Sequence, residues 1–322
     1  MGKTIGLPST LTYYSYFPFW NKFFSALNYE VVASPASSKQ IIDWGVKETV
    51  NDACIPIKLF HGHVIALRDK VDYLFIPRMV SVDGKATFCP KFLGLPDMVR
   101  ASIDGLPEII DQRIELKRNT HGLLATCYKI GAALKENHIN ITNAYRKAYI
   151  AHFLYRSQLI NGVLPGEILH DQTLNVRNSR TMGGINLAVL GYPYEVHDPY
   201  ISVNLLQNLE AMKVNVWTAE MVPDAILAKY RYKLSKDLFW HYSNQVLWAC
   251  YYYLEQPIDG IVHVSAFGCG PDSMVDKLME LETKAHNVPF ITLTIDEHTG
   301  EAGVLTRLEA FVDMVSYRRE RK

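Results

Sequence analysis

Short runs of apolar residues alternate along the chain with longer segments in which apolar positions recur at helical spacing. The short runs predict buried strands at Lys3–Pro8, Glu30–Ser34, Asp72–Met79, Ile185–Leu190, Asn215–Thr218, Gly260–Ala266 and Phe290–Ile295. The amphipathic segments predict helices at Tyr13–Leu27, from Ser37 or Ser38 to Val50, at Pro56–Asp69, Asn204–Met212, Asp237–Leu254 and Met274–Ala285, and from about Glu301 to Arg318. Because strands and helices alternate, the pattern predicts an α/β fold with parallel sheets and right-handed crossovers.

The strand pattern stops in the middle of the chain. Between about 112 and 165, two amphipathic segments predict helices at Asn119–Leu134 and Thr142–Ile160. Pro165-Gly166 and the polar run Asn175–Arg180 are typical of a boundary. We therefore predict an N-terminal α/β domain at 1–112, a helical bridge at 113–165 and a C-terminal α/β domain at 166–322. The two α/β domains could be similar halves.

Composition narrows the class of protein. The chain has 322 residues, of which 48% are hydrophobic and 20% charged, as in ordinary soluble globular proteins. Its 33 Lys and Arg balance 33 Asp and Glu, so the net charge is zero and no overall positive charge favours binding to nucleic acid or an anionic membrane. No apolar run approaches the roughly 20 residues of a transmembrane helix, and the start lacks a signal-peptide pattern. With five cysteines, an odd number, the expected location is a reducing cytoplasm.

Three of the cysteines share a local context. Cys269 lies in Phe267-Gly268-Cys269-Gly270-Pro271-Asp272-Ser273, between a buried strand and a helix in which Pro271 suits the first helical position. Cys54 and Cys89 are also followed by proline within two residues. The carboxyl end of a strand is where ligands bind in open α/β sheets, and a helix N-terminus favours a thiolate. Cys127 and Cys250 lie inside amphipathic helices, where a small buried hydrophobic residue is the usual interpretation.

Three thiolates from two domains suit an iron–sulfur cluster with one iron left open, or another soft metal. Cys54, Cys89 and Cys269 are 35 and 180 residues apart, which fits neither a zinc ribbon nor a ferredoxin pattern. On spacing alone, they could equally be three unrelated buried cysteines in turns.

The motifs around these cysteines resemble the 2-hydroxyacyl-CoA dehydratase superfamily. They are most similar to its acyl-CoA dehydratase activase-related branch, and the similarity spans nearly the whole chain. The sequences that carry it are Cys54-Ile-Pro-Ile-Lys58 with His61-Gly62-His63, Phe88-Cys89-Pro90-Lys91, Phe267–Ser273, Asp296-Glu297-His298-Thr299-Gly300-Glu301-Ala302-Gly303, and Thr306–Phe311.

The resemblance implies two Rossmann-like domains around a [4Fe-4S] cluster, with Cys54, Cys89 and Cys269 as its ligands. In the dehydratases an ATP-driven activator supplies the electron. We therefore expect a partner of that kind, or a related dehydratase or reductase component. The chain itself shows neither a G-x-x-x-x-G-K-[ST] motif nor the glycine-rich segments of actin/Hsp70-type ATPases, so we predict no ATP hydrolysis of its own.

Other residues near these motifs are candidates for binding and catalysis. Lys58 and Lys91, with Arg78, could stabilise the charge of a cluster or of a CoA phosphate, or could form an ordinary solvated edge. Gly268-x-Gly270-x-x-Ser273 partly matches a dinucleotide fingerprint, although Cys and Pro suit pyrophosphate poorly.

Acid–base chemistry has candidates of its own. His63 could bond a cluster sulfide or carry a proton, or could be a satisfied helix histidine. Glu297 and His298 follow the last predicted strand, where acid–base work is plausible and helix capping is the structural alternative.

These observations predict an oxygen-sensitive [4Fe-4S] protein in low-potential electron transfer or in dehydratase-type lyase chemistry. Acyl-CoA or another small molecule is a candidate ligand, and a homodimer is a candidate assembly. Two alternatives stay open. One is a non-catalytic cluster-binding or metal-binding module that assembles with an ATPase activator, and the other is a Rossmann-type nucleotide-binding enzyme without metal.

Overall fold

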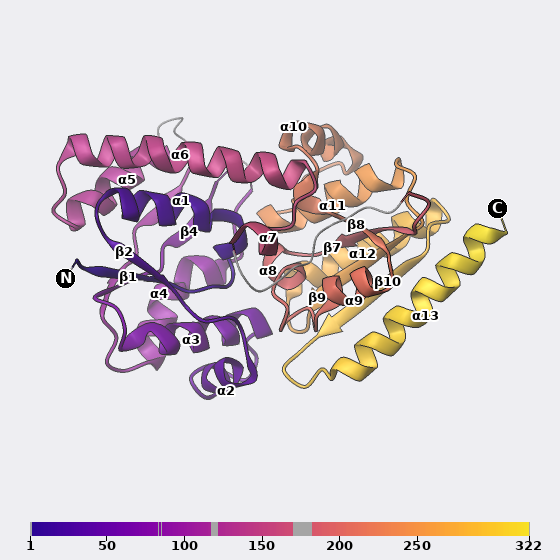
Figure 1. Cartoon of the computed structure of the whole chain (residues 1–322), viewed down its shortest axis with the longest axis horizontal. Helices are drawn as coiled ribbons and strands as arrows, with labels where there is room; N and C mark the ends of the chain where they lie inside the picture. The colour runs from indigo at the N-terminus through magenta and orange to yellow at the C-terminus, as the bar shows by residue number, and fades with distance from the viewer. Residues whose placement is uncertain (1, 83, 85, 117–121, 170–181, 322) are drawn as a thin grey trace. The chain divides into compact units, whose positions relative to one another are not determined.

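The computed structural model describes residues 2–82, 84, 86–116, 122–169 and 182–321 (Figure 1). By internal contacts the chain forms two compact units. The first unit is Met1–Arg156 with Phe239–His241, and the second is Ser157–Leu238 with Tyr242–Lys322. The first unit is therefore assembled from two separate pieces of the chain.

The first unit is built on a four-stranded sheet in the order β2-β1-β3-β5, and all its pairs are parallel. Its strands are β1 (Thr4–Leu7), β2 (Glu30–Ala33), β3 (Tyr73–Phe75) and β5 (Glu108–Ile110). Gly6 of β1 is in register with Val32 and with Leu74, so β1 is a central strand. A separate parallel pair joins β4 (Arg78–Ser81) to β6 (Arg113–Glu115).

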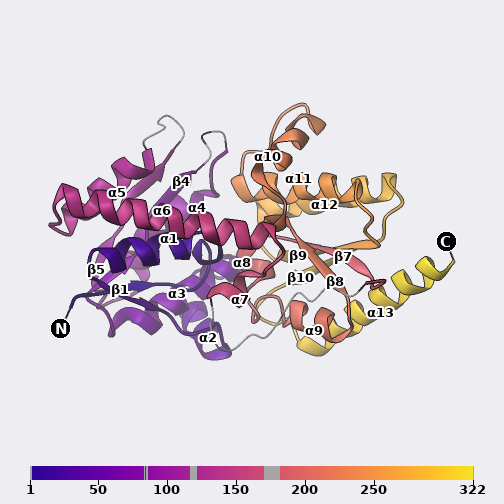
Figure 2. The same cartoon turned by 45° about the horizontal axis from the view of Figure 1, so that its top comes forward.

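Six helices follow these strands in the described part of the first unit, the last of them running on into the second. They are α1 (Tyr13–Ala26), α2 (Lys39–Lys47), α3 (Ile55–Arg68), α4 (Pro90–Ser102), α5 (Gly122–Ala133) and α6 (His138–Ile160). The aromatic face of α1 is buried, with Trp20 and Phe24 against Phe75 of β3. Helix α6 lies alongside α1 (Figures 1 and 2), and the Tyr155 hydroxyl donates to the Tyr14 carbonyl at 2.5 Å.

Helices α2 and α3 approach each other through glycine. A Cβ at Gly45 would lie 1.7 Å from the Lys58 carbonyl oxygen, and one at Gly62 would lie 1.9 Å from the Ile41 carbonyl oxygen. Only residues without a side chain fit there, because the backbones themselves are in contact. This packing fixes α3, which carries the Cys54 motif at its start.

The second unit has a four-stranded parallel sheet in the order β10-β9-β7-β8. Its strands are β7 (Asn186–Leu190), β8 (Asn215–Thr218), β9 (Gly260–Ala266) and β10 (Phe290–Ile295). Every residue of β9 is buried, as expected for a central strand covered on both faces. The core joins this sheet to α13, with Leu187, Val262 and Leu293 in one cluster with Leu308 and Phe311.

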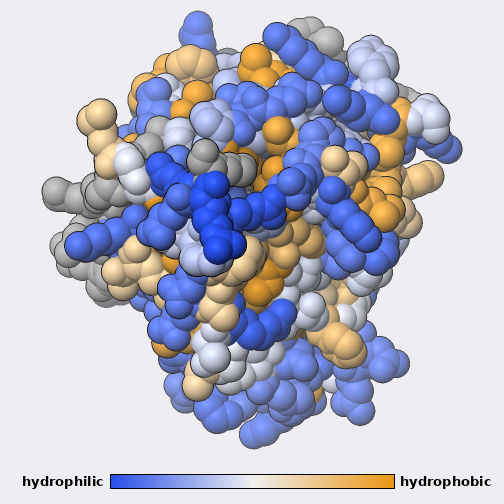
Figure 3. All heavy atoms as spheres, turned by 90° about the vertical axis from the view of Figure 1, so that its right-hand side faces the viewer, coloured by the Kyte–Doolittle hydropathy of each residue, from blue (hydrophilic) through white to orange (hydrophobic). Residues whose placement is uncertain are grey.

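Shorter and longer helices surround this sheet. They are α7 (Pro165–Leu169), α8 (Pro193–Val196), α9 (Leu205–Ala211), α10 (Asp224–Leu227), α11 (His241–Leu254), α12 (Gly270–Ala285) and α13 (Glu301–Glu320), with 3₁₀ segments η1 (Ala219–Met221) and η2 (Ala228–Lys233). On the face seen in Figure 3, hydrophilic residues predominate and hydrophobic ones are interspersed among them. Among the described residues, no helix combines the length and the apolar character needed to cross a membrane.

The two units share one strand order. In each main sheet the second, first, third and fourth strands lie side by side. In such a sheet the connections leave the first and third strands in opposite directions, so a crevice opens at their carboxyl ends. The switch point lies between β1 and β3 in the first unit and between β7 and β9 in the second.

The predicted α/β fold with parallel sheets is confirmed, and so is the identity of most elements. The predicted strand Asp72–Met79 is wrong in one respect, because Ile76-Pro77 separates β3 from β4. Helix α4 and strands β5 and β6 are additional to the prediction. The predicted helix from Asp237 begins at His241, and part of the helix predicted at Asn119–Leu134, like the polar run Asn175–Arg180, falls outside the described residues. The predicted domain boundaries stay a prediction.

Candidate functional site

Three cysteines occupy the same position relative to a helix. Cys54, Cys89 and Cys269 are the N-cap residues of α3, α4 and α12, and each helix has proline in its first turn. None of the three side chains makes a capping hydrogen bond. Each sulfur therefore lies at the positive end of a helix dipole, which favours a thiolate.

Lys91 links two of these thiols within the first unit. Its Nζ donates to Cys54 Sγ at 3.6 Å, and its backbone N–H donates to the Cys89 sulfur. Burial raises the pKa of Cys89, the charge of Cys54 raises it further, and Lys91 opposes both effects. Because Lys91 contacts both sulfurs, the two thiols lie near each other. One cation thus lies near two thiols and offsets negative charge on their sulfurs.

A returning piece of chain supports the segment before Cys89. Thr87 donates its N–H to the Phe239 carbonyl at 3.0 Å and accepts from the His241 N–H at 2.8 Å. The ring of Phe88 lies 5.1 Å from that of His241, centroid to centroid. Phe239–His241 therefore pairs like a short strand with the residues that lead into α4.

Cys269 lies at the switch point of the second sheet. The chain leaves β9 through Gly268, whose φ of +76° favours glycine, and the Cys269 N–H donates to the Ala266 carbonyl at 3.1 Å. Across the crevice, Gly191 follows β7, and a Cβ there would lie 2.6 Å from the Val264 carbonyl oxygen. Two glycines therefore shape the turns on either side of the thiol.

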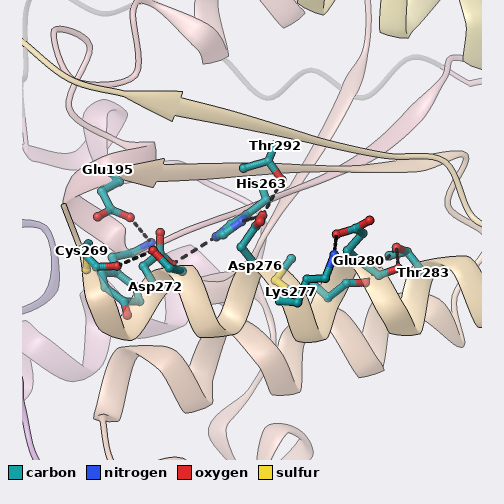
Figure 4. A network of polar contacts seen from close by, with 12 residues as sticks. Glu195, His263, Cys269, Asp272, Asp276, Lys277, Glu280, Thr283 and Thr292 are labelled. Atoms are coloured by element: carbon teal, nitrogen blue, oxygen red, sulfur yellow. Dashed lines mark hydrogen bonds and ion pairs between the residues drawn. The ribbon is translucent and has the colours of Figure 1, made fainter. Parts of the chain in front are cut away.

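A buried charged network lies behind Cys269 (Figure 4). His263 of β9 contacts Asp276 Oδ1 through Nδ1 at 2.8 Å and Asp272 Oδ1 through Nε2 at 3.2 Å. Burial alone would lower the pKa of His263, but Asp272 and Asp276 outweigh it and raise that pKa to about 9. At neutral pH the ring is therefore an imidazolium that donates to both carboxylates, and Asp276 also accepts from Thr292.

Acidic groups gather around the same end of α12. Asp272 is fully buried, and its Oδ2 has no hydrogen-bond partner among the described residues. The pKa of Tyr192, which follows β7, is raised well above its usual value by burial and by the charges of Asp272, Cys269 and Glu195. The Tyr192 hydroxyl shares a hydrogen bond of 2.7 Å with Ser243. The site can therefore hold a cationic or proton-bearing group next to the thiol.

The residues predicted for acid–base work have structural partners. His63 is fully buried, with Nδ1 2.8 Å from Ser34 Oγ and Nε2 3.0 Å from Ser37 Oγ, and burial lowers its pKa to about 3. Its ring is therefore neutral. His298 is exposed, and its N–H donates to Asp296 Oδ1 at 2.9 Å in the turn before α13, where Glu297 also lies.

The residues predicted for binding are separated in the fold. Lys58 is buried in the first turn of α3, while Arg78 pairs with Asp97 and Asp111 rather than with a cysteine. Ser273 Oγ donates to the Cys269 carbonyl of its own helix at 3.0 Å, which gives the nucleotide alternative little support. Gly270 has open space where a Cβ would stand.

No group of three or more His, Cys, Asp or Glu side chains that could hold a metal ion occurs within the residues that the structure describes. In the first unit Cys54 and Cys89 share contacts with Lys91, and Cys269 belongs to the second unit. Within the first unit, the soft donors Cys54 and Cys89, with Lys91 beside them, have the chemistry of thiolate ligands.

Sequence reasoning missed the network of His263, Asp272 and Asp276. A signal was present, since a histidine in the apolar run Ile261-Val-His-Val264 of a buried strand needs a polar partner. The carboxylates that supply it lie 9 and 13 residues further on, in the next helix.

Comparison with known families agrees with this architecture. Residues 4–222 match the family described as CoA enzyme activase uncharacterised domain (DUF2229), so the chain belongs to that family. The match includes Cys54 and Cys89 and ends before Cys269. No curated protein matches the chain.

Proposed function

We propose that this chain binds a [4Fe-4S] cluster through Cys54, Cys89 and Cys269. Its role would be low-potential electron transfer, or dehydration chemistry related to that of the 2-hydroxyacyl-CoA dehydratases. One observation carries the proposal: these three cysteines are all helix N-cap residues with proline in the next turn, whereas Cys127 and Cys250 are buried inside helices. A bound cluster supplies one-electron redox chemistry and, at an iron without a cysteine ligand, a Lewis acid.

The residues of the chain would hold the cluster and balance its charge. Lys91 offsets the charge of the Cys54 and Cys89 thiolates, and the dipoles of α3, α4 and α12 add to this effect. His263 with Asp272 would keep the base of the Cys269 turn fixed.

The family description supports a partner for this chain. The description as a CoA enzyme activase domain supports an association with an activase or dehydratase component, which would supply electrons at the cost of ATP. The same description supports a second candidate function. In that case the chain binds the cluster or another metal without catalysis and assembles with an ATPase activator.

The test is anaerobic reconstitution with iron and sulfide, followed by iron and sulfide analysis and EPR of the reduced protein. We expect about four irons per chain, because that is the content of the proposed cluster. Cys54→Ala, Cys89→Ala and Cys269→Ala should each lose most of it. Cys127→Ala and Cys250→Ala are the matched controls, since both thiols are fully buried in helices.

Two results would overturn the proposal. Less than one iron per chain after reconstitution would exclude the cluster, and cluster loss in Cys127→Ala but not in Cys89→Ala would show that the ligands are wrong. Acyl-CoA turnover is then measured with the cluster-loaded chain alone and with an ATP-dependent activator added. Turnover under either condition indicates a catalytic protein, and its absence under both indicates an assembly module. ATP hydrolysis by this chain alone would contradict the expected dependence on a partner.

A further inference from the structure

The first unit contains an apolar cavity of about 40 Å³ at the switch point of its own sheet. The cavity lies between the segment that follows β1, Leu7–Tyr13, and the end of β3 at Phe75–Pro77. Phe60 of α3, together with Phe92 and Leu95 of α4, completes its wall. The wall therefore includes the two helices that begin at Cys54 and Cys89.

One polar atom in this lining has no partner. Thr10 is 1% exposed, and its Oγ1 makes no hydrogen bond among the described residues. Leaving a buried hydroxyl unpaired is unfavourable, and such groups are rare in native structures. A ligand oxygen in the cavity would satisfy it.

The loop that carries Thr10 is held rigidly. The Ser9 N–H donates to Ser34 Oγ and the Ser9 hydroxyl donates to the Ser34 carbonyl, both at 2.8 Å. Ser34 Oγ is in turn bonded to the neutral ring of His63. This chain of hydrogen bonds holds the backbone next to Thr10 in place. His63 thus acts as a positioning residue for the wall of the cavity.

Water is a poor occupant of this space. A cavity needs at least about 10–15 Å³ to hold one water molecule, and that water needs two to four polar partners. About 40 Å³ could hold roughly three water-sized atoms, but most of the lining is aromatic or aliphatic. We propose that the cavity binds a small apolar molecule of about three or four heavy atoms, with one hydroxyl or carbonyl oxygen that pairs with Thr10.

The proposal is tested by methyl NMR of the full chain with its nine methionines labelled at the methyl carbon. The probes are 1-propanol, which has one hydroxyl, and xenon, which has none. Met79 lines the cavity and reports on binding, while Met314 of α13 is partly exposed elsewhere and serves as the control. We expect the Met79 signal to shift with 1-propanol until it saturates, and the Met314 signal to shift little.

Variants of Thr10 separate the hydroxyl from the cavity. Thr10→Val should weaken 1-propanol binding at least fivefold and leave xenon binding within twofold, while Thr10→Ser should bind 1-propanol like the native chain. Thr10→Val should also raise the melting temperature, because it removes an unpaired buried hydroxyl. A Met79 shift that never saturates, or unchanged propanol affinity in Thr10→Val, would overturn the proposal. The saturation of the Met79 shift is measured on the native chain, so this test holds even if a variant fails to fold.

Discussion

Because His263 is charged in the folded protein, the second unit should lose stability as the pH rises into the alkaline range. The pKa of His263 is about 9 in the folded protein, against an ordinary value of 6.5. A pKa that is raised on folding contributes stability that is complete below pH 6.5 and is lost as the pH rises through 9. Because the ring is fully buried, solvent does not screen the effect. The difference corresponds to about 3 kcal/mol of unfolding free energy lost between pH 6 and pH 10.

The assay must report on the second unit alone. Cys250 is fully buried in α11, so its modification by a thiol reagent during urea titration measures unfolding of that unit. Cys127, equally buried in α5, measures the first unit in the same sample. We expect the free energy from Cys250 to fall by about 3 kcal/mol more than that from Cys127 over this pH range.

Two variants identify the group responsible. In His263→Gln the extra pH dependence should disappear, and the unit should be less stable at pH 6 because the carboxylates of Asp272 and Asp276 lose their cation. Asp276→Asn keeps the histidine and removes one charge, so the midpoint of the pH dependence should move below 9. If native protein and His263→Gln show the same pH dependence at Cys250, the buried imidazolium is not its source.

Three further predictions concern the first unit and the turns. Lowering the pH from 7 to 5 should destabilise the first unit by about 2 kcal/mol, measured at Cys127. Burial holds the pKa of His63 at about 3, so only the unfolded chain takes up the proton in this range, and His63→Gln should remove the loss. Gly62→Ala should lower the free energy of unfolding by about 3 kcal/mol in urea denaturation, since its Cβ meets a backbone oxygen. Gly270→Ala, where a Cβ has open space, should change it by less than about 0.5 kcal/mol, and equal effects would refute the packing argument. Lys91→Met should raise the pKa of Cys89 further, seen as a shift to higher pH in its alkylation profile, and an unchanged profile would show that the ammonium has no effect there.

Much of the fold could be predicted because its signals are local. The run Gly260–Ala266 is apolar throughout and is a fully buried central strand. Proline after Cys54 and Cys269 predicted helix starts, and both cysteines are N-cap residues. The elements that were not predicted have weak local signals. Strands β5 and β6 have three residues each, and Pro96 lies inside α4, which masks its helical pattern.

The site was less predictable because its contacts are distant in sequence. His263 gains its charge from Asp272 and Asp276 on the following helix, and the periodicity of a strand carries no information about such partners. For His63 the sequence left a proton carrier and a satisfied helix histidine both open, because its two serine partners come from the segment after β2 and are distant in sequence. The cavity beside Thr10 depends on packing among four separate segments, which no local pattern records.

The pairing of Thr87 with Phe239–His241 bears on how the protein can be divided. A fragment that ends at Arg156 would keep the β2-β1-β3-β5 sheet but lose the strand beside Thr87, two residues before Cys89. The backbone of Thr87 would then lack two hydrogen bonds, and the ring of Phe88 would lose its neighbour His241. A faithful fragment of the first unit has to carry residues 239–241 as a tethered or added peptide. Adding that peptide to the short fragment should order the turn at Cys89, and removing it should reverse the effect.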